Sequence, residues 1–293
     1  MKDSKMSNDY KSIAFQGEYG AYSDMACRTV FPDLKTLPCE SFYDAFNAVN
    51  DGRADLAMIP VDNTIAGRVA DVHHLMPDGD LFIIGEHFQD VNHMLLGTKG
   101  TKIEDIKYVH SHVHAIPQCR EFLKKMGAKS YIHADTAGAA KEIAQKNDKE
   151  HGAIASSLAA KIYDLEILEK GIEDQSHNMT RFLILSPEPY YPPIDANNVI
   201  TSLLFEVRNI PAALYKALGG FATNGLSLTK LESYVDENFQ AARFYCDIEG
   251  HPESQSFNRA LEELGFFAKD VKLLGSYIAH PSRKAYEQDY GEL

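Results

Sequence analysis

Up to about residue 190, the chain alternates short apolar runs with stretches of helical periodicity. Runs typical of buried strands fall at residues 12–16, 55–61, 81–86, 108–109, 131–134, 153–155 and 182–185. Apolar positions at helical spacing lie between them, at residues 25–31, 42–49, 65–76, 116–126 and 136–145. Strands that alternate with helices predict parallel α/β sheets, whose ligands bind beyond the carboxyl ends of the strands. Two such series predict two α/β lobes with a cleft between them.

Several residues mark where the predicted helices begin. Ser41 and Asp44 form a capping box, and Asp135 is the predicted N-cap of the helix that follows it. Ser23 is the predicted N-cap of the helix that follows the glycine turn at residues 17–23. A glycine turn before a helix offers free backbone N–H groups and a positive dipole end, which suits a carboxylate or a phosphate. The turn is neither a P-loop nor a dinucleotide fingerprint, because the required lysine and third glycine are absent.

A different pattern follows a proline-rich segment at residues 187–193. The later residues predict strand, helix, two strands, helix and strand, at residues 199–207, 212–223, 226–234, 241–248, 254–264 and 271–279. This βαββαβ order is that of a ferredoxin-like module, whose exposed sheet edge favours pairing between copies. We therefore expect a two-lobed domain over residues 10–190 and a second domain over residues 198–283.

Composition narrows the class of protein. The chain has 293 residues, of which 44% are hydrophobic and 24% charged, as in a soluble globular protein of about two domains. The net charge of −13 argues against nucleic acid or an anionic membrane surface as a partner. The four cysteines are far apart and form no Cys-x-x-Cys pair, which favours reduced thiols over disulfides or a zinc site. No signal-peptide core and no run of ~20 apolar residues occurs, so we expect a cytoplasmic protein.

Polar side chains gather at the ends of three predicted strands. They are Asp62, Asn63 and Thr64, then Ser111 with Gln118, and finally Asn178 with Thr180 and Arg181. Together with the glycine turn they predict a pocket of amides, hydroxyls and one guanidinium, with few general bases. Such a site suits the positioning and polarisation of a polyanion better than nucleophilic attack. A hydroxyl and a guanidinium at the mouth of a buried strand also suit a site that grips an anion and handles a proton.

Two other chemistries have weaker support. His110, His112 and His114 alternate, so a strand would point them to one face, as a metal site needs. The run continues into a predicted helix, however, and no carboxylate or cysteine of ligand spacing adjoins it, so we expect no metal site. A serine hydrolase is disfavoured because no Gly-x-Ser-x-Gly elbow surrounds Ser111 or Ser156.

Four motifs occur in the order found in the prephenate dehydratase family. They are Gly17-x-x-Gly20-x-Tyr22-Ser23, Ile59-Pro60-Val61-Asp62-Asn63-Thr64, Ser111-His112-x-x-Ala115-x-x-Gln118-Cys119 and Asn178-x-Thr180-Arg181-Phe182. The βαββαβ module resembles the family's ACT regulatory domain, so the resemblance covers nearly the whole chain. The fold it implies is a two-lobed, periplasmic-binding-protein-like α/β catalytic domain followed by a ferredoxin-like ACT domain. It implies conversion of prephenate to phenylpyruvate, with loss of carbon dioxide and water and without a cofactor or a metal.

The resemblance also implies roles for residues within the motifs. Thr180 matches the family's catalytic threonine and would donate or relay a proton to the leaving hydroxide, supported by Arg181 or by Asp62. The implied catalytic residues are Thr180, Asn63, Gln118, Ser111 and Asp62. The implied substrate-binding residues are Tyr22, Ser23, Thr64, Asn178, Arg181 and Phe182, the last of which we expect to pack beneath the site. Asp62 stands where glutamate is frequent in the family, which leaves its role open.

In the ACT part, two segments resemble the family's phenylalanine-binding motifs. The implied effector-binding residues are Asn209, Pro211, Ala212, Ala213, Leu214, Leu231, Glu232 and Ser233. They make L-phenylalanine the expected effector. Ala212 takes a usual glycine position, and Tyr234-Val235 replace the Arg-Pro that commonly follows Ser233. These departures weaken the inference of feedback more than that of catalysis.

Three points stay open at this stage. The substrate is prephenate or, alternatively, arogenate, which differs by an amino group on the side chain. Two lobes with a hinge also describe a non-catalytic amino-acid sensor, although a pure binder has no need of a proton-relaying Thr180. The assembly is expected to be a homodimer or a homotetramer.

Overall fold

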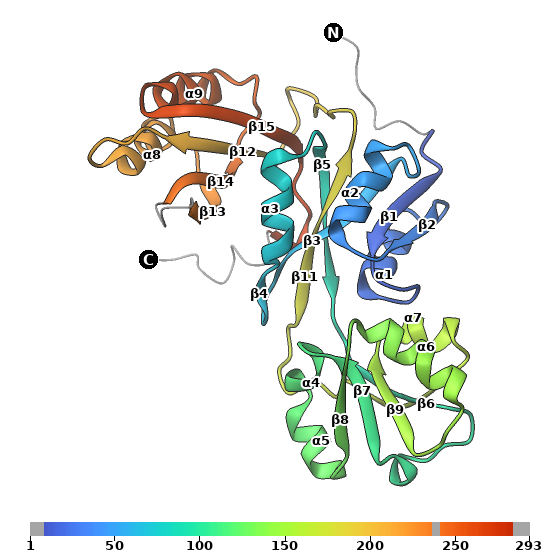
Figure 1. Cartoon of the computed structure of the whole chain (residues 1–293). Coiled ribbons are helices and arrows are strands. Elements are labelled where there is room, and N and C mark those ends of the chain that lie inside the picture. The colour runs from blue at the N-terminus through green and yellow to red at the C-terminus, as the bar shows by residue number, and fades with distance from the viewer. Residues whose placement is uncertain (1–8, 236–240, 284–293) are drawn as a thin grey trace. The chain divides into compact units, whose positions relative to one another are not determined.

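The computed structural model describes residues 9–235 and 241–283 of the chain. These residues form two compact units. One contains Tyr10–Met76 and His87–Leu183, and the other contains Pro77–Glu86 and the described residues from Ile184 onward. The first unit consists of two α/β lobes, shown in blue and green in Figure 1. The domain bounds expected from the sequence stay a prediction.

Lobe one is built on a mixed sheet in which β1 pairs with β2 and β3 in parallel. The strand order is β2 (Lys35–Cys39), β1 (Ser12–Gln16), β3 (Leu56–Asn63), β11 (Met179–Ser186) and β5 (Phe82–Asp90), with β4 (Gly67–Arg68) paired to β3. The helices of this part are α1 (Tyr22–Val30), α2 (Phe42–Asn50) and α3 (Ala70–Asp78). Ser41 Oγ accepts a hydrogen bond from the Asp44 N–H at 3.0 Å, which confirms the predicted start of α2.

Lobe two has its own sheet, covered by helices on both faces (Figure 1). The strand order is β10 (Glu166–Lys170), β6 (Met94–Gly97), β9 (His151–Ala155), β7 (Tyr108–His112) and β8 (Lys129–His133). The helices are η1 (Ile103–Asp105), α4 (Ala115–Gln118), α5 (Arg120–Met126), α6 (Thr136–Lys146) and α7 (Ser157–Ile162). Leu95, Val109 and Ile154 pack with Leu123 of α5 on one face, and α6 packs on β7 and β9.

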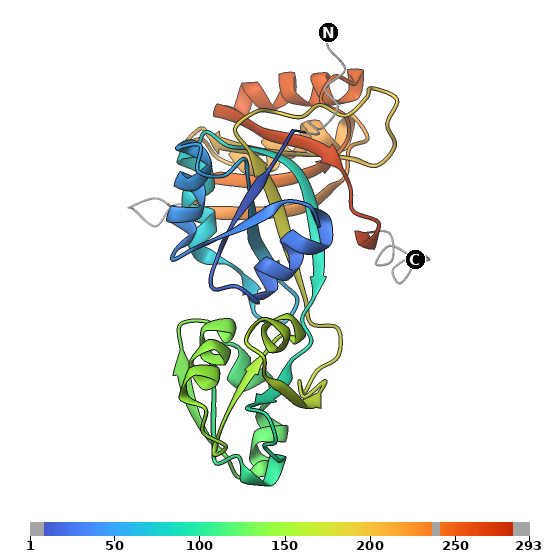
Figure 2. The ribbon, with the colours of Figure 1, turned by 90° about the vertical axis from the view of Figure 1, so that its right-hand side faces the viewer.

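Two chain segments connect the lobes, one after β5 and one before β11. They run side by side in both views of the ribbon, and the Val91 N–H donates to the Asn178 carbonyl at 2.8 Å (Figure 1, Figure 2). The end of β5 and the start of β11 are therefore tied together at the point where the chain passes between the lobes.

The remaining sheet has the order β13 (Leu228–Val235), β14 (Ala241–Glu249), β12 (Val199–Val207) and β15 (Ala268–Ile278). Its helices are α8 (Ala213–Thr223) and α9 (Gln255–Phe267), so the described elements follow the predicted βαββαβ order. Phe205, Phe221 and Phe257 lie in its core, between the sheet and the two helices. Ala212 adopts the left-handed backbone conformation, with φ +58°, which explains why glycine is usual there.

The structure corrects several sequence predictions. Ser23 does not cap α1, because Ala21 occupies the N-cap and Ser23 lies inside the first turn. The helix predicted over residues 65–76 begins only at Ala70, because Gly67–Arg68 folds back as β4 onto β3. The helix predicted over residues 116–126 is split at Cys119, and the Gln118 carbonyl accepts from the Asp174 N–H instead. The sheets that were predicted to be parallel are mixed, because β4 pairs antiparallel with β3, and β6 pairs antiparallel with β9 and β10. The strands β2, β4, β6 and β10 were not predicted.

The glycine turn before α1 contacts α6 and α7 of lobe two. Ser156 Oγ donates to the Gly20 carbonyl at 2.5 Å, and Glu18 pairs with Lys141 of α6 at 3.0 Å. Gly20 has φ +90°, and a Cβ there would stand 2.7 Å from the Ala159 Cα. The close approach of the two lobes at this point thus requires glycine. Among the described residues, no helix is long and apolar enough to cross a membrane.

We predict that Gly20→Ala lowers the free energy of unfolding by about 3 kcal/mol, from backbone strain together with overpacking against Ala159. Gly52→Ala is the matched control, since Gly52 has φ +71° but no atom within 4 Å of the added Cβ. It should lose only about 1 kcal/mol. Urea unfolding of both variants measures the difference. Equal losses would show that the contact with Ala159 tolerates a methyl group.

Candidate active site

Side chains from both lobes line a crevice made of two adjoining cavities. The smaller cavity, of about 170 Å³, is lined by Tyr22, Asn63, Ala66, Val91, His93, His112, His114, Ala115, Gln118, Thr136, Asn178 and Thr180. The larger, of about 600 Å³, shares seven of these residues, among them Thr180 and Asn63, and extends along Gly17, Ser23 and Phe182. The glycine turn, the end of β3 and the start of β11 therefore meet at one place.

Strand β11 decides which residues of the motif Asn178-x-Thr180-Arg181-Phe182 face the crevice. Alternate residues of a strand point to opposite faces, and Thr180 and Phe182 both line the larger cavity. Arg181 between them is buried, lines neither cavity, and has a guanidinium nitrogen 3.7 Å from Asp62 Oδ2. This arrangement suits an ion pair inside lobe one better than a guanidinium that grips substrate.

Asn63 is oriented by two backbone amides of the turn that follows β3. Its Oδ1 accepts from the Ile65 N–H at 2.9 Å and from the Ala66 N–H at 2.7 Å. Since only the oxygen of the carboxamide accepts, the Nδ2 group must point the other way. It donates one hydrogen to Asn178 Oδ1 at 2.8 Å and the other to Thr180 Oγ1 at 3.0 Å.

A series of side-chain hydrogen bonds continues from Asn63 into lobe two, and the donor and acceptor of each bond follow from the one before. Asn178 uses its oxygen towards Asn63, so its Nδ2 donates to Gln118 Oε1 at 2.7 Å. Gln118 therefore presents an acceptor to His93 Nε2, 2.9 Å away, and His93 must donate. Two backbone amides thus determine the orientation of two further carboxamides and the tautomer of one histidine.

His93 is a residue of this site that sequence reasoning missed. It lies between β5 and β6, and its backbone N–H donates to Glu173 Oε2 at 2.9 Å. Burial lowers the pKa of His93, so the ring is neutral near pH 7 with its hydrogen on Nε2. Its Nδ1 is then an acceptor and lies 3.1 Å from Tyr22 Oη, whose one hydrogen goes either to this nitrogen or to the Asn92 carbonyl at 2.8 Å. No periodicity or motif in the sequence distinguishes this histidine from the other eleven.

Thr180 is left with a hydrogen to donate. Its Oγ1 already accepts from Asn63, and this side chain lines both cavities. A hydroxyl carries one hydrogen, and accepting a bond does not use it. The arrangement therefore presents a hydroxyl donor to whatever fills the crevice, with a carboxamide N–H available to stabilise negative charge on its oxygen.

The N-terminus of α1 contributes a positive dipole end to the larger cavity. Tyr22 and Ser23 are the first two residues of the helix, and both line this cavity. Amides of a first helical turn have no partner within the helix and favour an anion. This part of the crevice suits a carboxylate group of a ligand.

Besides Arg181, three predicted site residues lie away from both cavities. Ser111 is fully buried, and its Oγ donates to the Ile154 carbonyl at 2.7 Å. Thr64 Oγ1 donates to the His177 carbonyl and accepts from the Met179 N–H, so it anchors the start of β11. Asp62 pairs with Arg181, as described above. Their proposed roles in catalysis or binding stay predictions, and the structure gives each a contact within the protein.

Lobe two adds two histidines and a threonine to the crevice. His112, His114 and Thr136 line both cavities, and the rings of His112 and His114 lie 5.2 Å apart. Burial, together with the charge of His114, lowers the pKa of His112, which is therefore neutral near pH 7. Neither histidine was predicted as a site residue.

Comparisons with known proteins identify the family. The family model for prephenate dehydratase matches residues 13–190, more than half of the chain. This chain belongs to the prephenate dehydratase family. The predicted family is thereby confirmed, and with it a hydro-lyase activity in aromatic amino-acid biosynthesis.

Two curated relatives show how similar other members are. The bifunctional N-acyl-homoserine lactone acylase/prephenate dehydratase of Komagataeibacter europaeus is 48% identical over 278 residues, covering 94% of this chain and 99% of that protein. Arogenate dehydratase 2 of Petunia hybrida is 39% identical over 281 residues, covering 90% of this chain and 71% of that protein.

Solved structures of the family share the fold. The prephenate dehydratase of Arthrobacter aurescens in complex with L-Phe is 25% identical, with a TM-score of 0.83, and the match covers 95% of this chain and 97% of that one. A structure described as GqqA, a novel type of quorum-quenching acylase, is 48% identical, with a TM-score of 0.87 over 93% and 100% of the two chains. The predicted fold class is confirmed by this likeness.

Proposed function

We propose that this member of the family is a prephenate dehydratase in which Thr180 donates the hydrogen bond that expels the ring hydroxyl. The observation that carries the proposal is the hydrogen bond from Asn63 Nδ2 to Thr180 Oγ1, which leaves the threonine hydrogen free to point into the crevice. Asn63 also supports the threonine oxygen as negative charge develops on it. This role differs from the support by Arg181 or Asp62 that the sequence led us to expect.

The proposed reaction breaks two bonds of the prephenate ring. The electrons of the bond to the departing carboxylate pass into the ring, which becomes aromatic as the bond to the hydroxyl breaks. Carbon dioxide leaves, and the hydroxide takes up one proton, relayed from solvent through Thr180, to leave as water. The enzyme must supply a proton donor and a fixed orientation, and the crevice offers both.

The positive end of a helix at the crevice fits one carboxylate of the substrate. The positive end of α1 at Tyr22 and Ser23 would hold a carboxylate, and the carboxamides of Asn178 and Gln118 are already committed to each other. Neither the N-terminus of α1 nor the Asn178–Gln118 pair distinguishes prephenate from arogenate. Comparing kcat/KM for the two substrates on the same preparation decides between them.

We predict that Thr180→Ala lowers kcat for prephenate by about 100-fold or more, because a positioned proton donor is lost. Thr180→Ser, which keeps a hydroxyl on a less restricted side chain, should retain part of the activity. Phenylpyruvate is measured by its absorbance in strong alkali. Full turnover by the alanine variant would remove Thr180 from the mechanism.

The variant Asn63→Asp tests the direction of the hydrogen bond in the same assay. Its carboxylate still accepts from the Ile65 and Ala66 amides, but its other oxygen now accepts the Thr180 hydrogen. The hydroxyl is then turned away from the substrate, and kcat should fall as in Thr180→Ala. Unchanged kcat would show that the threonine does not need this orientation.

We further propose that the ACT module binds L-phenylalanine, as the Arthrobacter aurescens relative does. Leu231 and Ser233 of β13 lie exposed on one side of the strand, while Glu232 pairs with Lys230 on the other. Ala212 and Ala213 lie at the start of α8, after the exposed Asn209 and Pro211, and Leu214 packs partly into the module's core. The two segments that resemble the family's motifs are thus accessible, apart from the buried Ala213.

We predict that L-phenylalanine lowers kcat/KM by about 5-fold or more and gives a heat of binding in calorimetry. Leu231→Ala should weaken that binding about 10-fold. Ile278→Ala is the matched control, a similarly exposed apolar residue on β15 of the same module, outside both motif segments. The absence of both heat and inhibition would leave the module without this effector.

A second candidate function is hydrolysis of N-acyl-homoserine lactones, favoured by the 48% identity with the bifunctional relative. The two serines considered as nucleophiles argue against a serine mechanism, since Ser111 and Ser156 each donate to a backbone carbonyl and are fully buried. A water activated by the neutral His112 is the alternative that the crevice offers. Release of homoserine lactone from an N-acyl substrate, absent in a His112→Gln variant, would establish this activity.

A further inference from the structure

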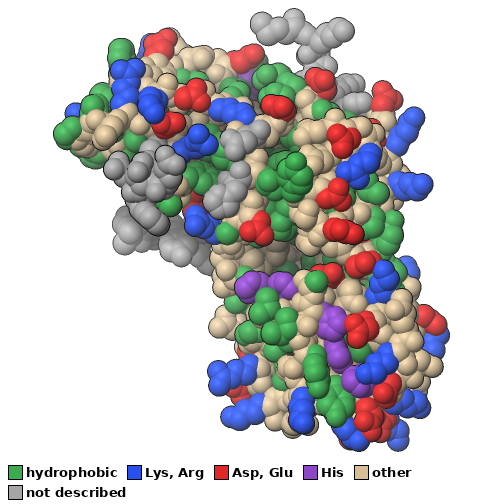
Figure 3. All heavy atoms as spheres, viewed as in Figure 1, with side chains coloured by type: hydrophobic (Ala, Val, Ile, Leu, Met, Phe, Trp, Pro, Cys, Tyr) green, Lys and Arg blue, Asp and Glu red, His purple; other side chains and the backbone are tan. Residues whose placement is uncertain are grey.

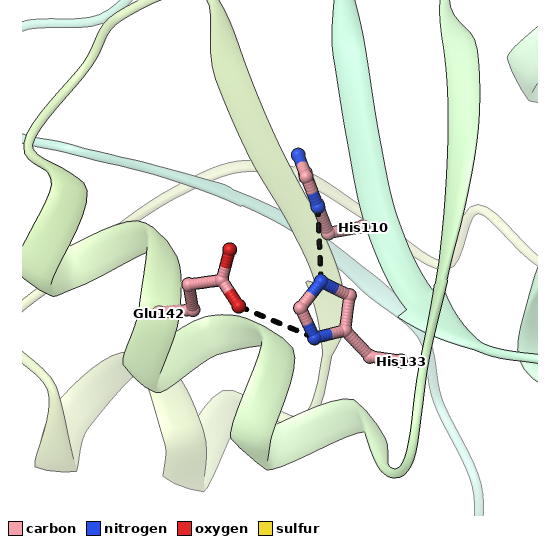
Figure 4. A group of neighbouring side chains, drawn as sticks. All are labelled: His110, His133 and Glu142. Atoms are coloured by element: carbon pink, nitrogen blue, oxygen red, sulfur yellow. Dashed lines mark hydrogen bonds and ion pairs between the residues drawn. The ribbon is translucent and has the colours of Figure 1, made fainter.

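A cluster of three side chains in lobe two is not used by the proposed reaction. Histidines gather on this part of the surface (Figure 3), and the cluster consists of His110 of β7, His133 of β8 and Glu142 of α6 (Figure 4). One donor atom from each lies within 4.8 Å of the other two. None of the three lines either cavity of the crevice. The cluster is therefore separate from the candidate active site.

The spacing of the two imidazole nitrogens matches that of neighbouring donors in a tetrahedral transition-metal site. Metal–nitrogen bonds of about 2.0–2.1 Å place neighbouring donors roughly 3.3 Å apart. His110 Nδ1 and His133 Nε2 are 3.1 Å apart, the two nitrogens facing each other. The Glu142 carboxylate is 3.5 Å from the other nitrogen of His133, and this half-exposed side chain can rotate to present an oxygen to the first two.

His110 also has a partner for its second nitrogen. His110 Nε2 is 2.8 Å from His151 Nδ1, so His110 can donate there while its Nδ1 coordinates an ion. Histidines that bind metals nearly always donate their other ring N–H to an acceptor, which orients the ring. His110 is itself buried, which holds its ring in place.

The donor set selects a class of ion. Two imidazoles and one carboxylate suit zinc and the neighbouring first-row divalent metals, whereas calcium and magnesium require mostly oxygen donors. Three protein donors leave a fourth position for water. We propose that His110, His133 and Glu142 form a binding site for a zinc-like divalent cation, which would fasten the edge strand β8 to β7 and α6.

A hydrogen-bonded chain without metal is the competing arrangement. Lys146 Nζ lies 2.8 Å from His151 Nε2, so Lys146 can donate to His151, His151 to His110, and His110 to His133. In that arrangement a hydrogen occupies the space between His110 and His133 where the ion would bind. The lysine thus favours the metal-free form, and removing it should favour the ion.

The test uses the full-length protein, freed of metal with a chelator and titrated with Zn²⁺ alone by calorimetry or with Co²⁺ alone by visible absorption. We predict one ion per chain, a tetrahedral Co²⁺ spectrum, and a rise of about 5 °C in Tm with excess Zn²⁺. Glu142→Gln should weaken binding at least about 10-fold, and Lys146→Met should strengthen it. Glu121→Gln, an exposed glutamate on α5, is the matched control and should bind as the unchanged protein does.

His133→Asn completes the test, because His133 is partly exposed on an edge strand and its loss should leave the fold intact by circular dichroism. It should abolish the one-to-one binding. Undiminished binding by both His133→Asn and Glu142→Gln would overturn the proposal and indicate another site, such as His112 with His114. The absence of any saturable binding would equally overturn it, in favour of the hydrogen-bonded chain.

Discussion

The candidate site depends on one constraint, the two backbone N–H groups that bind Asn63 Oδ1. They belong to Ile65 and Ala66, in the turn where β3 folds back to form β4. Because a carboxamide has one accepting and one donating end, these two bonds decide the orientation of Asn63 and, through it, of every polar group in contact with it. The hydrogen of Thr180 faces the crevice for this reason, although no acid or base touches that side chain among the described contacts. Two backbone N–H groups of a turn thus determine which atoms of Asn63 and Thr180 donate hydrogen bonds and which accept them.

The crevice also needs its two lobes to meet at a defined distance. Gly20, Ser156 and Ala159 provide that contact, and Gly20 permits it only because it has no Cβ. The glycine turn therefore has a structural task besides the one expected from the sequence, which was to offer amides to an anion. Both tasks fall on the same turn because it connects β1 to α1 at the edge of the crevice. The side-chain hydrogen bonds that run from Asn63 to His93 form a second connection between the lobes.

Sequence patterns predicted the parts of this site that lie at strand ends. Asn63, Asn178 and Thr180 were expected to share one pocket, and they are in contact because the start of β11 lies beside the end of the neighbouring strand β3. The pattern could not say which side of β11 would face the crevice, because period-two alternation separates Thr180 from Arg181 without giving the direction. It could not find His93 either, because that residue follows a strand in an irregular segment, and its contacts with Gln118 and Tyr22 are tertiary. The missed strands β2, β4, β6 and β10 are short, and β6 and β10 pair with each other although three strands lie between them in the chain.

Helix α6 links the two parts of lobe two that carry chemistry. Its first residue, Thr136, lines the crevice, and Glu142 stands six positions further on, beside His133. Asp135 caps the helix by accepting from the Gly138 N–H at 2.6 Å, so the position of its N-terminus is well determined. An ion held by Glu142 and the two histidines would fix the middle of the same helix against β7 and β8. A helix of eleven residues moves largely as a rigid body. The ion would therefore also hold Thr136, the residue of α6 that lines the crevice, in place. The histidines that looked like one group in the sequence thus have separate surroundings, His112 and His114 at the crevice and His110 beneath α6.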